Sequence, residues 1–207
     1  AGVVEKRDQV RLGEPTGVDL PSERAGNMPS REWKRGVKGV SWYPGDTVNT
    51  SIGQGFMLAT PLQLAVMSAR IAARGQQIVP RVVRGIGEEI QDQAVSKGVI
   101  NAPPVFWDYV INAMTDVVHS PRGTAKSINK NLPYTIAGKT GTAQVVSIAQ
   151  GQKYNSAAIS KRNWDHALFI AFAPADNPEI AVGLIVENGE HGSSTAAHRF
   201  GGRHWRR

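Results

Sequence analysis

One short stretch of the chain combines residue types that can bind an extended, anionic ligand. Residues 136–143 read Ile-Ala-Gly-Lys-Thr-Gly-Thr-Ala, so a lysine and two threonines stand beside two glycines. An ammonium group and hydroxyls can hold a carboxylate, and glycine lets the backbone of an edge strand approach the backbone of a ligand. We therefore predict that Lys139, Thr140, Gly141 and Thr142 form a ligand-binding edge strand.

The order Gly138-Lys139-Thr140 also ends phosphate-binding P-loops, in which glycine amides surround the phosphates. That motif needs a glycine five residues before Gly138, and Pro133 occupies the position. Because proline has no amide hydrogen to donate, the sequence argues against nucleotide binding.

Length and composition limit the remaining possibilities. The 207 residues suffice for one compact domain or for a piece of a larger one. The absence of cysteine excludes disulfides and thiolate metal sites and is compatible with an oxidising compartment such as a periplasm. No apolar run reaches the roughly 18 residues that cross a bilayer, and no leader opens the chain. We expect any anchor or export signal to lie outside this sequence.

The net charge of +7 does not indicate a nucleic-acid-binding face. The tail 198–207 holds four arginines and no acidic residue, whereas a nucleic-acid-binding domain spreads basic and aromatic residues over its folded surface. The histidines show no paired spacing outside this tail, so we expect no metal site. The sequence indicates no cofactor either.

Two helices are predicted ahead of the candidate strand. The first has Thr60 as N-cap, Pro61 at its first position and Gly75 as its end. Apolar residues at three- and four-residue steps predict its core-facing stripe: Leu64, Met67 and Ile71. The second helix starts at residues 103–104 and stops before Pro121. Residues 13–55 resemble an ordered connecting region, because they carry aromatic anchors among glycines and prolines.

The strand signals predict a small antiparallel sheet. Residues 167–173 and 180–186 are apolar and flank a turn-rich segment, which indicates a hairpin. The candidate strand is expected to run from Tyr134 to Val146. Residues 78–83 are expected to form a short strand, which Pro80 confines to an edge or a bulge. The predicted fold class is mixed α/β (α+β), an antiparallel sheet flanked by helices.

Several separated segments together resemble the transpeptidase domain of class B penicillin-binding proteins. Within that class, residues 13–20 and 24–34 are similar to the transpeptidases of elongation in rod-shaped Gram-negative bacteria. The resemblance covers about residues 12–197 and implies part of a penicillin-binding/β-lactamase-like fold. The remaining matching segments are residues 51–55, 60–65, 139–142, 172–178 and 186–188.

The resemblance implies specific roles for the candidate strand. In this family the Lys-Thr-Gly strand lines the active cleft, and a peptidoglycan stem peptide ending in D-Ala-D-Ala, or a β-lactam, lies along it. Lys139 then supports proton transfer, and Thr140, Gly141 and Thr142 hold the substrate. The amide of Thr142 forms one half of the oxyanion hole, where fixed donors stabilise the developing negative charge.

The family's nucleophile is missing from the expected place. Relatives carry a Ser-x-x-Lys motif and then a Ser-x-Asn motif well upstream of Lys-Thr-Gly. Only Ser127-Ile128-Asn129-Lys130 satisfies both patterns, and one serine cannot serve as both residues. The short segment from Lys130 to Gly138 also leaves no room for intervening helices. We therefore expect no nucleophile in this chain and no activity of the chain alone.

The two ends depart from the family pattern. We expect residues 1–11 to be an atypical N-terminal end, residues 12–197 to be the C-terminal part of a transpeptidase domain, and residues 198–207 to be a basic atypical tail of a truncated piece. For the intact protein, the resemblance implies a place on the periplasmic face of the inner membrane. It also implies an anchor outside this sequence and partners in the elongation machinery.

The sequence also allows other interpretations of the chain's function. The chain could be a non-catalytic binding or interaction module, or a truncated product without function. A hydrolase triad of Asp165 and His166 with Ser156 or Ser160 is weakly founded, because sequence proximity is no evidence of triad geometry. A boundary between loop and strand accounts for Asp165-His166, and an exit turn accounts for residues 187–192.

Overall fold

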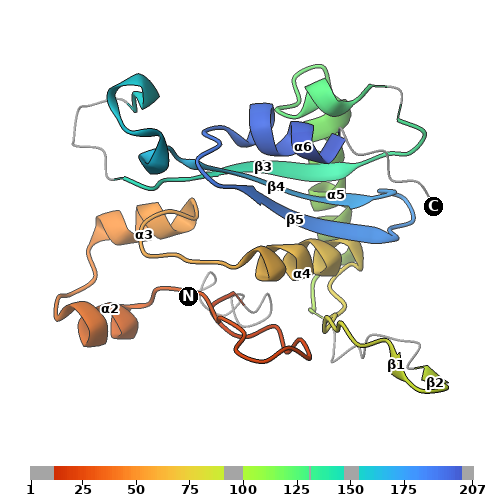
Figure 1. Cartoon of the computed structure of the whole chain (residues 1–207), viewed down its shortest axis with the longest axis horizontal. Helices are drawn as coiled ribbons and strands as arrows, with labels where there is room; N and C mark the ends of the chain where they lie inside the picture. Colours follow the sequence, from red (N-terminus) through yellow and green to blue (C-terminus); the bar gives the residue numbers. More distant parts are fainter. Residues whose placement is uncertain (1–11, 91–99, 131, 147–153, 202–207) are drawn as a thin grey trace. The chain divides into compact units, whose positions relative to one another are not determined.

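A computed structural model of the chain describes residues 12–90, 100–130, 132–146 and 154–201 (Figure 1). The chain divides into two compact units. The first unit comprises Ala1–Gln63 and Val79–Ala94, and the second comprises Leu64–Ile78 and Val95–Arg207. The expected atypical end 1–11 and most of the expected tail 198–207 lie outside the described residues.

The first unit contains two short helices, α2 (Arg31–Lys38) and α3 (Pro44–Ser51). The side chain of Ser30 caps α2 by accepting a hydrogen bond from the Trp33 amide at 3.1 Å, and Gly39 ends the helix in the left-handed conformation. The interpretation of residues 13–55 as a connecting region missed both helices. Each spans only eight residues, too few to show a clear apolar period.

A buried lysine joins the two helices of the first unit. Lys34 is only 4% exposed, and its ammonium donates to the carboxylate of Asp46 and lies 4.4 Å from the centre of the Tyr43 ring. The hydrogen bond from Lys34 and a second one from the Tyr43 amide lower the pKa of the Asp46 carboxyl below its ordinary value. The pair therefore keeps the buried ammonium compensated at neutral pH.

Helix α4 (Pro61–Ala72) begins where the sequence predicts. Thr60 and Gln63 form a reciprocal capping box: the Thr60 hydroxyl accepts from the Gln63 amide at 3.1 Å, and the Gln63 side chain accepts from the Thr60 amide at 2.9 Å. Pro61 occupies the first helical position, where its missing amide hydrogen costs nothing. The helix stops at Ala72, before the predicted end at Gly75.

The buried stripe of α4 differs from the prediction. Leu64, Met67 and Ile71 are only partly buried, whereas Val66 and two polar residues, Ser68 and Arg70, are buried. Polar residues are buried here because backbone carbonyls accept their hydrogen bonds: Ser68 donates to Ala171 at 2.9 Å, and Arg70 donates to Ile78 at 3.2 Å. An apolar pattern cannot reveal such positions.

No strand forms at residues 78–83, contrary to the prediction. The carboxylate of Asp19 accepts hydrogen bonds from the amides of Val82 and Val83 at 2.6 and 2.8 Å, so a side chain takes the place of a strand partner. A small hairpin follows instead, with β1 (Gly85–Ile86) paired to β2 (Glu89–Ile90).

The second unit contains a three-stranded sheet in the order β3-β4-β5. Strands β3 (Ala137–Ala143), β4 (His166–Ala173) and β5 (Ile180–Val186) pair antiparallel, which confirms the predicted sheet and hairpin. Helix α5 (Pro104–His119) agrees with the predicted second helix. Among the described residues no helix is long and apolar enough to cross a membrane.

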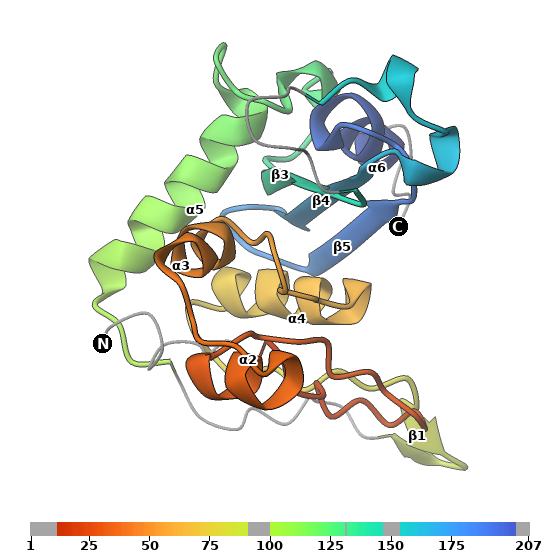
Figure 2. The ribbon, with the colours of Figure 1, turned by 90° about the vertical axis from the view of Figure 1, so that its left-hand side faces the viewer.

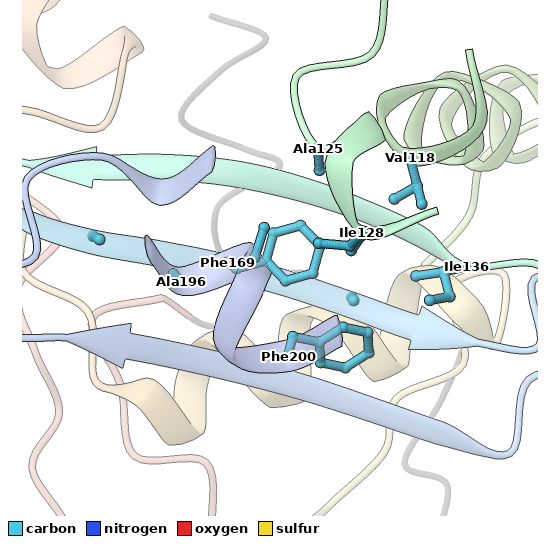
Figure 3. Packing of buried hydrophobic residues seen from close by; sticks show 10 residues of the cluster. Val118, Ala125, Ile128, Ile136, Phe169, Ala196 and Phe200 are labelled. Atoms are coloured by element: carbon cyan, nitrogen blue, oxygen red, sulfur yellow. The ribbon is translucent and has the colours of Figure 1, made fainter. Parts of the chain in front are cut away.

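Two apolar clusters cover the two faces of this sheet. One contains Phe169 of β4 and includes residues of η1 (Lys126–Ile128), η4 (Gly192–Ala196) and α6 (Ala197–Gly201) (Figure 3). The other contains Phe172 of β4 with residues of α4 and α5. Figures 1 and 2 accordingly show α6 and α4 on opposite sides of the sheet. Side chains of β4 point alternately to the two clusters, as the pleat requires.

The expected boundary at residue 197 falls inside a packed region. Phe200 of α6 is 5% exposed, and its ring centre lies 5.4 Å from that of Phe169. The family-like part and the expected tail are therefore in contact through this pair.

We expect Phe169→Ala to lower the free energy of unfolding by about 3–5 kcal/mol, because the side chain is fully buried and its loss leaves a cavity. Urea denaturation would measure the change. The matched control is Phe106→Ala on α5, where the side chain is 54% exposed and the change should stay within about 0.5 kcal/mol. Equal losses for the two variants would contradict this packing.

We expect Asp46→Asn to destabilise the chain at pH 7, because it removes the partner of the buried Lys34. The pKa of Asp46 is lowered in the folded state, so its contribution to stability is present above the unfolded pKa of about 4 and is lost as pH falls through the lower folded value. The melting temperatures of the two proteins should therefore converge as the pH falls through the lowered pKa of Asp46. Glu88→Gln, at the exposed turn between β1 and β2, is the control, and a difference that persists at low pH would refute the expectation.

Candidate functional site

The candidate motif lies on an edge of the sheet. Strand β3 pairs only with β4 among the described strands, which confirms the prediction of an edge strand (Figure 2). In this register Lys139 faces Ile170, Thr140 faces Phe169, and Thr142 faces Ala167. Cross-strand partners share a face of the sheet.

The motif therefore divides between the two faces. Thr140 and Thr142 lie on the face of Phe169 and α6, whereas Lys139 lies on the face of Ile170. Within β3, residues 137 and 138 are buried, residue 139 is exposed, and residues 140–143 are partly buried. The strand is thus anchored at its start and accessible from Lys139 onward.

The ammonium of Lys139 donates to the carbonyl of the next residue, Thr140, at 2.7 Å. A carbonyl is neutral, so this contact positions the ammonium without neutralising it. An ammonium has three donors, and within the described parts of the chain the other two have no acceptor, so they can serve a carboxylate or a reacting group. The arrangement can supply positive potential beside the strand.

The hydroxyl of Thr140 lies 3.2 Å from the hydroxyl of Thr124, and either oxygen can be the donor. Thr124 comes from the segment between α5 and η1, which the sequence analysis did not connect with the motif. No pattern in the sequence points to this contact, because it depends on how the chain turns after α5.

His119 holds the start of β3, and the sequence did not indicate this role. Nε2 of His119 accepts a hydrogen bond from the amide of Ile136 at 3.0 Å. Ile136 is 1% exposed, so without this bond its amide would be buried and unsatisfied. The last residue of α5 thereby fixes where β3 begins.

Two glycines allow close packing around the motif. A Cβ on Gly138 would lie 2.7 Å from the ring of Phe169, so a side chain there would displace the core. A Cβ on Gly192 would lie 2.4 Å from the carbonyl oxygens of Gly141 and Leu168. Gly192 thus lets η4 pack directly on the backbone of β3 and β4. From its sequence, Gly192 is predicted to lie in an exit turn, and no pattern indicates this packing role.

Asp165 and His166 have structural partners. The Asp165 carboxylate accepts from the Val145 amide at 3.3 Å, and Nδ1 of His166 accepts from the Asn188 amide at 3.0 Å. Asn188 itself donates to the carbonyls of Arg162 and Trp164. These bonds support the interpretation of a strand boundary and an exit turn rather than a triad.

Ser127 lies in η1, a three-residue 3-10 helix that ends at Ile128. A Ser-x-x-Lys pair functions when both side chains project from one face of an α-helix. Lys130 lies beyond the end of η1, so this helix does not carry both residues.

A pocket of about 290 Å³ is lined by residues of α4, α5 and the β4–β5 turn, Ala72, Ile111 and Pro178 among them, and residues 139–142 do not line it. The described residues contain no group of three or more His, Asp or Glu side chains that could hold a metal ion.

Comparison with known proteins agrees with this geometry. The family model "Penicillin binding protein transpeptidase domain" matches residues 5–202. The peptidoglycan D,D-transpeptidase MrdA of Acinetobacter baumannii is 48% identical over 192 residues, which cover 91% of this chain and 28% of that protein.

Solved structures give the same result. The crystal structure of Pseudomonas aeruginosa PBP2 in complex with WCK 5153 matches with a TM-score of 0.79 and 43% identity, over 92% of this chain and 38% of that one. The complex between PBP2 and MreC from Helicobacter pylori matches with a TM-score of 0.70 and 32% identity, over 90% of this chain and 32% of that one.

The chain belongs to the penicillin-binding protein transpeptidase family. Within this family it is most like penicillin-binding protein 2, the MrdA type. The chain spans less than a third of the length of the curated MrdA relatives.

We expect Gly192→Ala to destabilise the chain by about 1–3 kcal/mol, because the new Cβ would collide with two backbone carbonyls and force β3 or η4 to move. Thermal melting would measure the loss, and amide hydrogen exchange at Gly141 should quicken. The same substitution at Gly36 in α2, where nothing lies within 4 Å of an added Cβ, should stabilise by about 0.5–1 kcal/mol. An unchanged melting temperature for Gly192→Ala would show that η4 does not pack closely on the backbone of β3.

Proposed function

We propose that this chain supplies the substrate-holding strand of a serine-type D,D-transpeptidase that cross-links peptidoglycan and binds penicillin. The observation that most supports this proposal is the position of the Lys-Thr-Gly-Thr motif on an accessible edge strand. In the described residues the Lys139 ammonium also has no acidic partner. An edge strand can bind a peptide as an added strand, and the flanking side chains then select its terminal carboxylate.

Each residue of the motif has a task in this proposal. Lys139 supports proton transfer and provides positive potential. Thr140 and Thr142 hold the substrate carboxylate through their hydroxyls, and Gly141 completes the substrate-binding stretch between them. The amide of Thr142 donates to the oxyanion of the tetrahedral intermediate, where one fixed donor contributes roughly 100- to 1000-fold in rate.

The acylated serine lies outside this chain in our proposal. Ser127 is the only serine followed three residues later by a lysine, and its short 3-10 helix does not support the Ser-x-x-Lys geometry. Alone, the chain is therefore expected not to form an acyl-enzyme. The alternative is a non-catalytic binding module or a product without function.

The partners follow from the same assignment. A PBP2 of Helicobacter pylori has been solved in complex with MreC. We propose that the intact protein likewise works with the elongation machinery on the periplasmic face of the inner membrane, and that its ligands are stem peptides and β-lactams.

A chimera tests the proposal. Residues 12–201 of this chain would replace the matching segment of the Acinetobacter baumannii MrdA relative, and the product would be incubated with a fluorescent penicillin and run on a denaturing gel. We expect a covalent band from the chimera and none from this chain alone. Lys139→Ala in the chimera should slow labelling by about 100-fold or more, because it removes the group that supports proton transfer.

Lys161→Ala is the matched control, since Lys161 is exposed and lies in η3 (Lys161–Asn163), outside the motif. A folded chimera that stays unlabelled would favour the non-catalytic alternative. A covalent band from this chain alone would show that it does hold a nucleophile.

A further inference from the structure

We propose that Thr124 is a positioning residue that orients the hydroxyl of Thr140 toward a ligand carboxylate. This inference rests on the proposed function and adds a residue outside the Lys-Thr-Gly-Thr motif to the carboxylate-binding group. Its basis is the distance of 3.2 Å between the two hydroxyl oxygens.

The segment that carries Thr124 is held firmly by its neighbours in the chain. The amide of Gly123 donates to the Ser120 carbonyl at 2.9 Å, and the amide of Ala125 donates to the Val117 carbonyl at 2.9 Å. Ala125 is fully buried in the cluster around Phe169 (Figure 3). Thr124 is thus exposed but flanked on both sides by fixed backbone.

Close packing on helix α5 fixes this turn further. A Cβ on Gly123 would lie 2.4 Å from the Val117 carbonyl oxygen and 2.5 Å from that of Asp116. The ammonium of Lys126 also donates to the Pro121 carbonyl at 2.9 Å. The backbone at Thr124, from which the hydroxyl projects, is therefore held by α5 and the core.

A carboxylate ligand would determine which of the two hydroxyls, Thr124 or Thr140, donates the hydrogen bond between them. Each hydroxyl has one proton, and in the free chain either can donate to the other. An ionised carboxylate only accepts, so Thr140 must turn its proton toward the ligand and accept the proton of Thr124. The two bonds then form a chain in which each strengthens the other. Without the Thr124 hydroxyl, the oxygen of Thr140 loses this donor.

The test compares Thr124→Val, which keeps the shape and removes the hydroxyl, with Thr124→Ser, which keeps the hydroxyl. The probes are N-acetyl-D-Ala-D-Ala and N-acetyl-D-alanine ethylamide, a truncated peptide that lacks the terminal carboxyl group. Amide chemical shifts of residues 138–143 in the ¹⁵N-labelled full chain would report binding, and a thermal melt would verify that each variant is folded.

We expect Thr124→Val to bind the carboxylate peptide roughly fivefold more weakly than the wild type, the effect of losing one ordinary hydrogen bond. Thr124→Ser should bind it as the wild type does, and the truncated peptide, which offers Thr140 no terminal carboxylate, should bind the wild type and Thr124→Val alike. This difference between ligands separates orientation of a carboxylate-binding group from simple packing.

The experiment distinguishes failure of the role of Thr124 from failure of the proposed function. Equal binding of the carboxylate peptide by wild type and Thr124→Val would overturn the role of Thr124 and leave the proposed function standing. Equal weakening for both peptides, or no recovery with Thr124→Ser, would overturn it as well, because the hydroxyl would not be the cause. A wild type whose β3 responds to neither peptide would overturn the proposed function and the inference together.

Discussion

The antiparallel pairing of β3 with β4 determines where every group of the candidate site lies. Pairing Thr140 with Phe169 places the threonine hydroxyls on the face of α6 and the lysine on the other face. A slip of one residue would exchange these faces. The fully buried Phe169 resists such a slip, because it packs on Phe200 and leaves room beside it only for a glycine at position 138.

Elements distant in sequence then hold β3 in place. His119 at the end of α5 binds the amide of Ile136 just before the strand, and Gly192 of η4 packs on the backbone of Gly141 within it. Both contacts involve main-chain groups, so they fix the path of the strand whatever side chains it carries. A ligand-binding strand fixed in this way loses little freedom on binding, which favours affinity.

The sequence predicts those features that depend on local chemistry. The capping box of Thr60 and Gln63 starts α4 at the predicted residue, and the two apolar runs around residues 174–179 form the predicted hairpin. Features that depend on contacts across the fold were missed. The amides of Val82 and Val83 bind a carboxylate more than 60 positions away, and the buried hydroxyl of Ser68 donates to a carbonyl of β4.

The same distinction applies to the candidate site. Lys139, Thr140 and Thr142 form one continuous motif, so their residue types alone suggest the chemistry. Thr124 precedes Thr140 by 16 positions in an ordinary turn, and only the packing of that turn on α5 brings the two hydroxyls together. The sequence therefore indicates the residues that we propose hold a ligand more readily than the residue that we propose orients one of them.

Lys139 differs from two other cations of the described residues in having no acidic partner. Lys34 and Arg74 are paired with Asp46 and Asp108, so binding an anion there would break an existing ion pair. Lys139 instead donates to a neutral carbonyl, and in the described part of the chain no carboxylate forms an ion pair with it. A carboxylate can approach its ammonium without displacing another acid of the described residues, and because Lys139 is exposed to solvent the ion pair itself contributes at most about 1 kcal/mol.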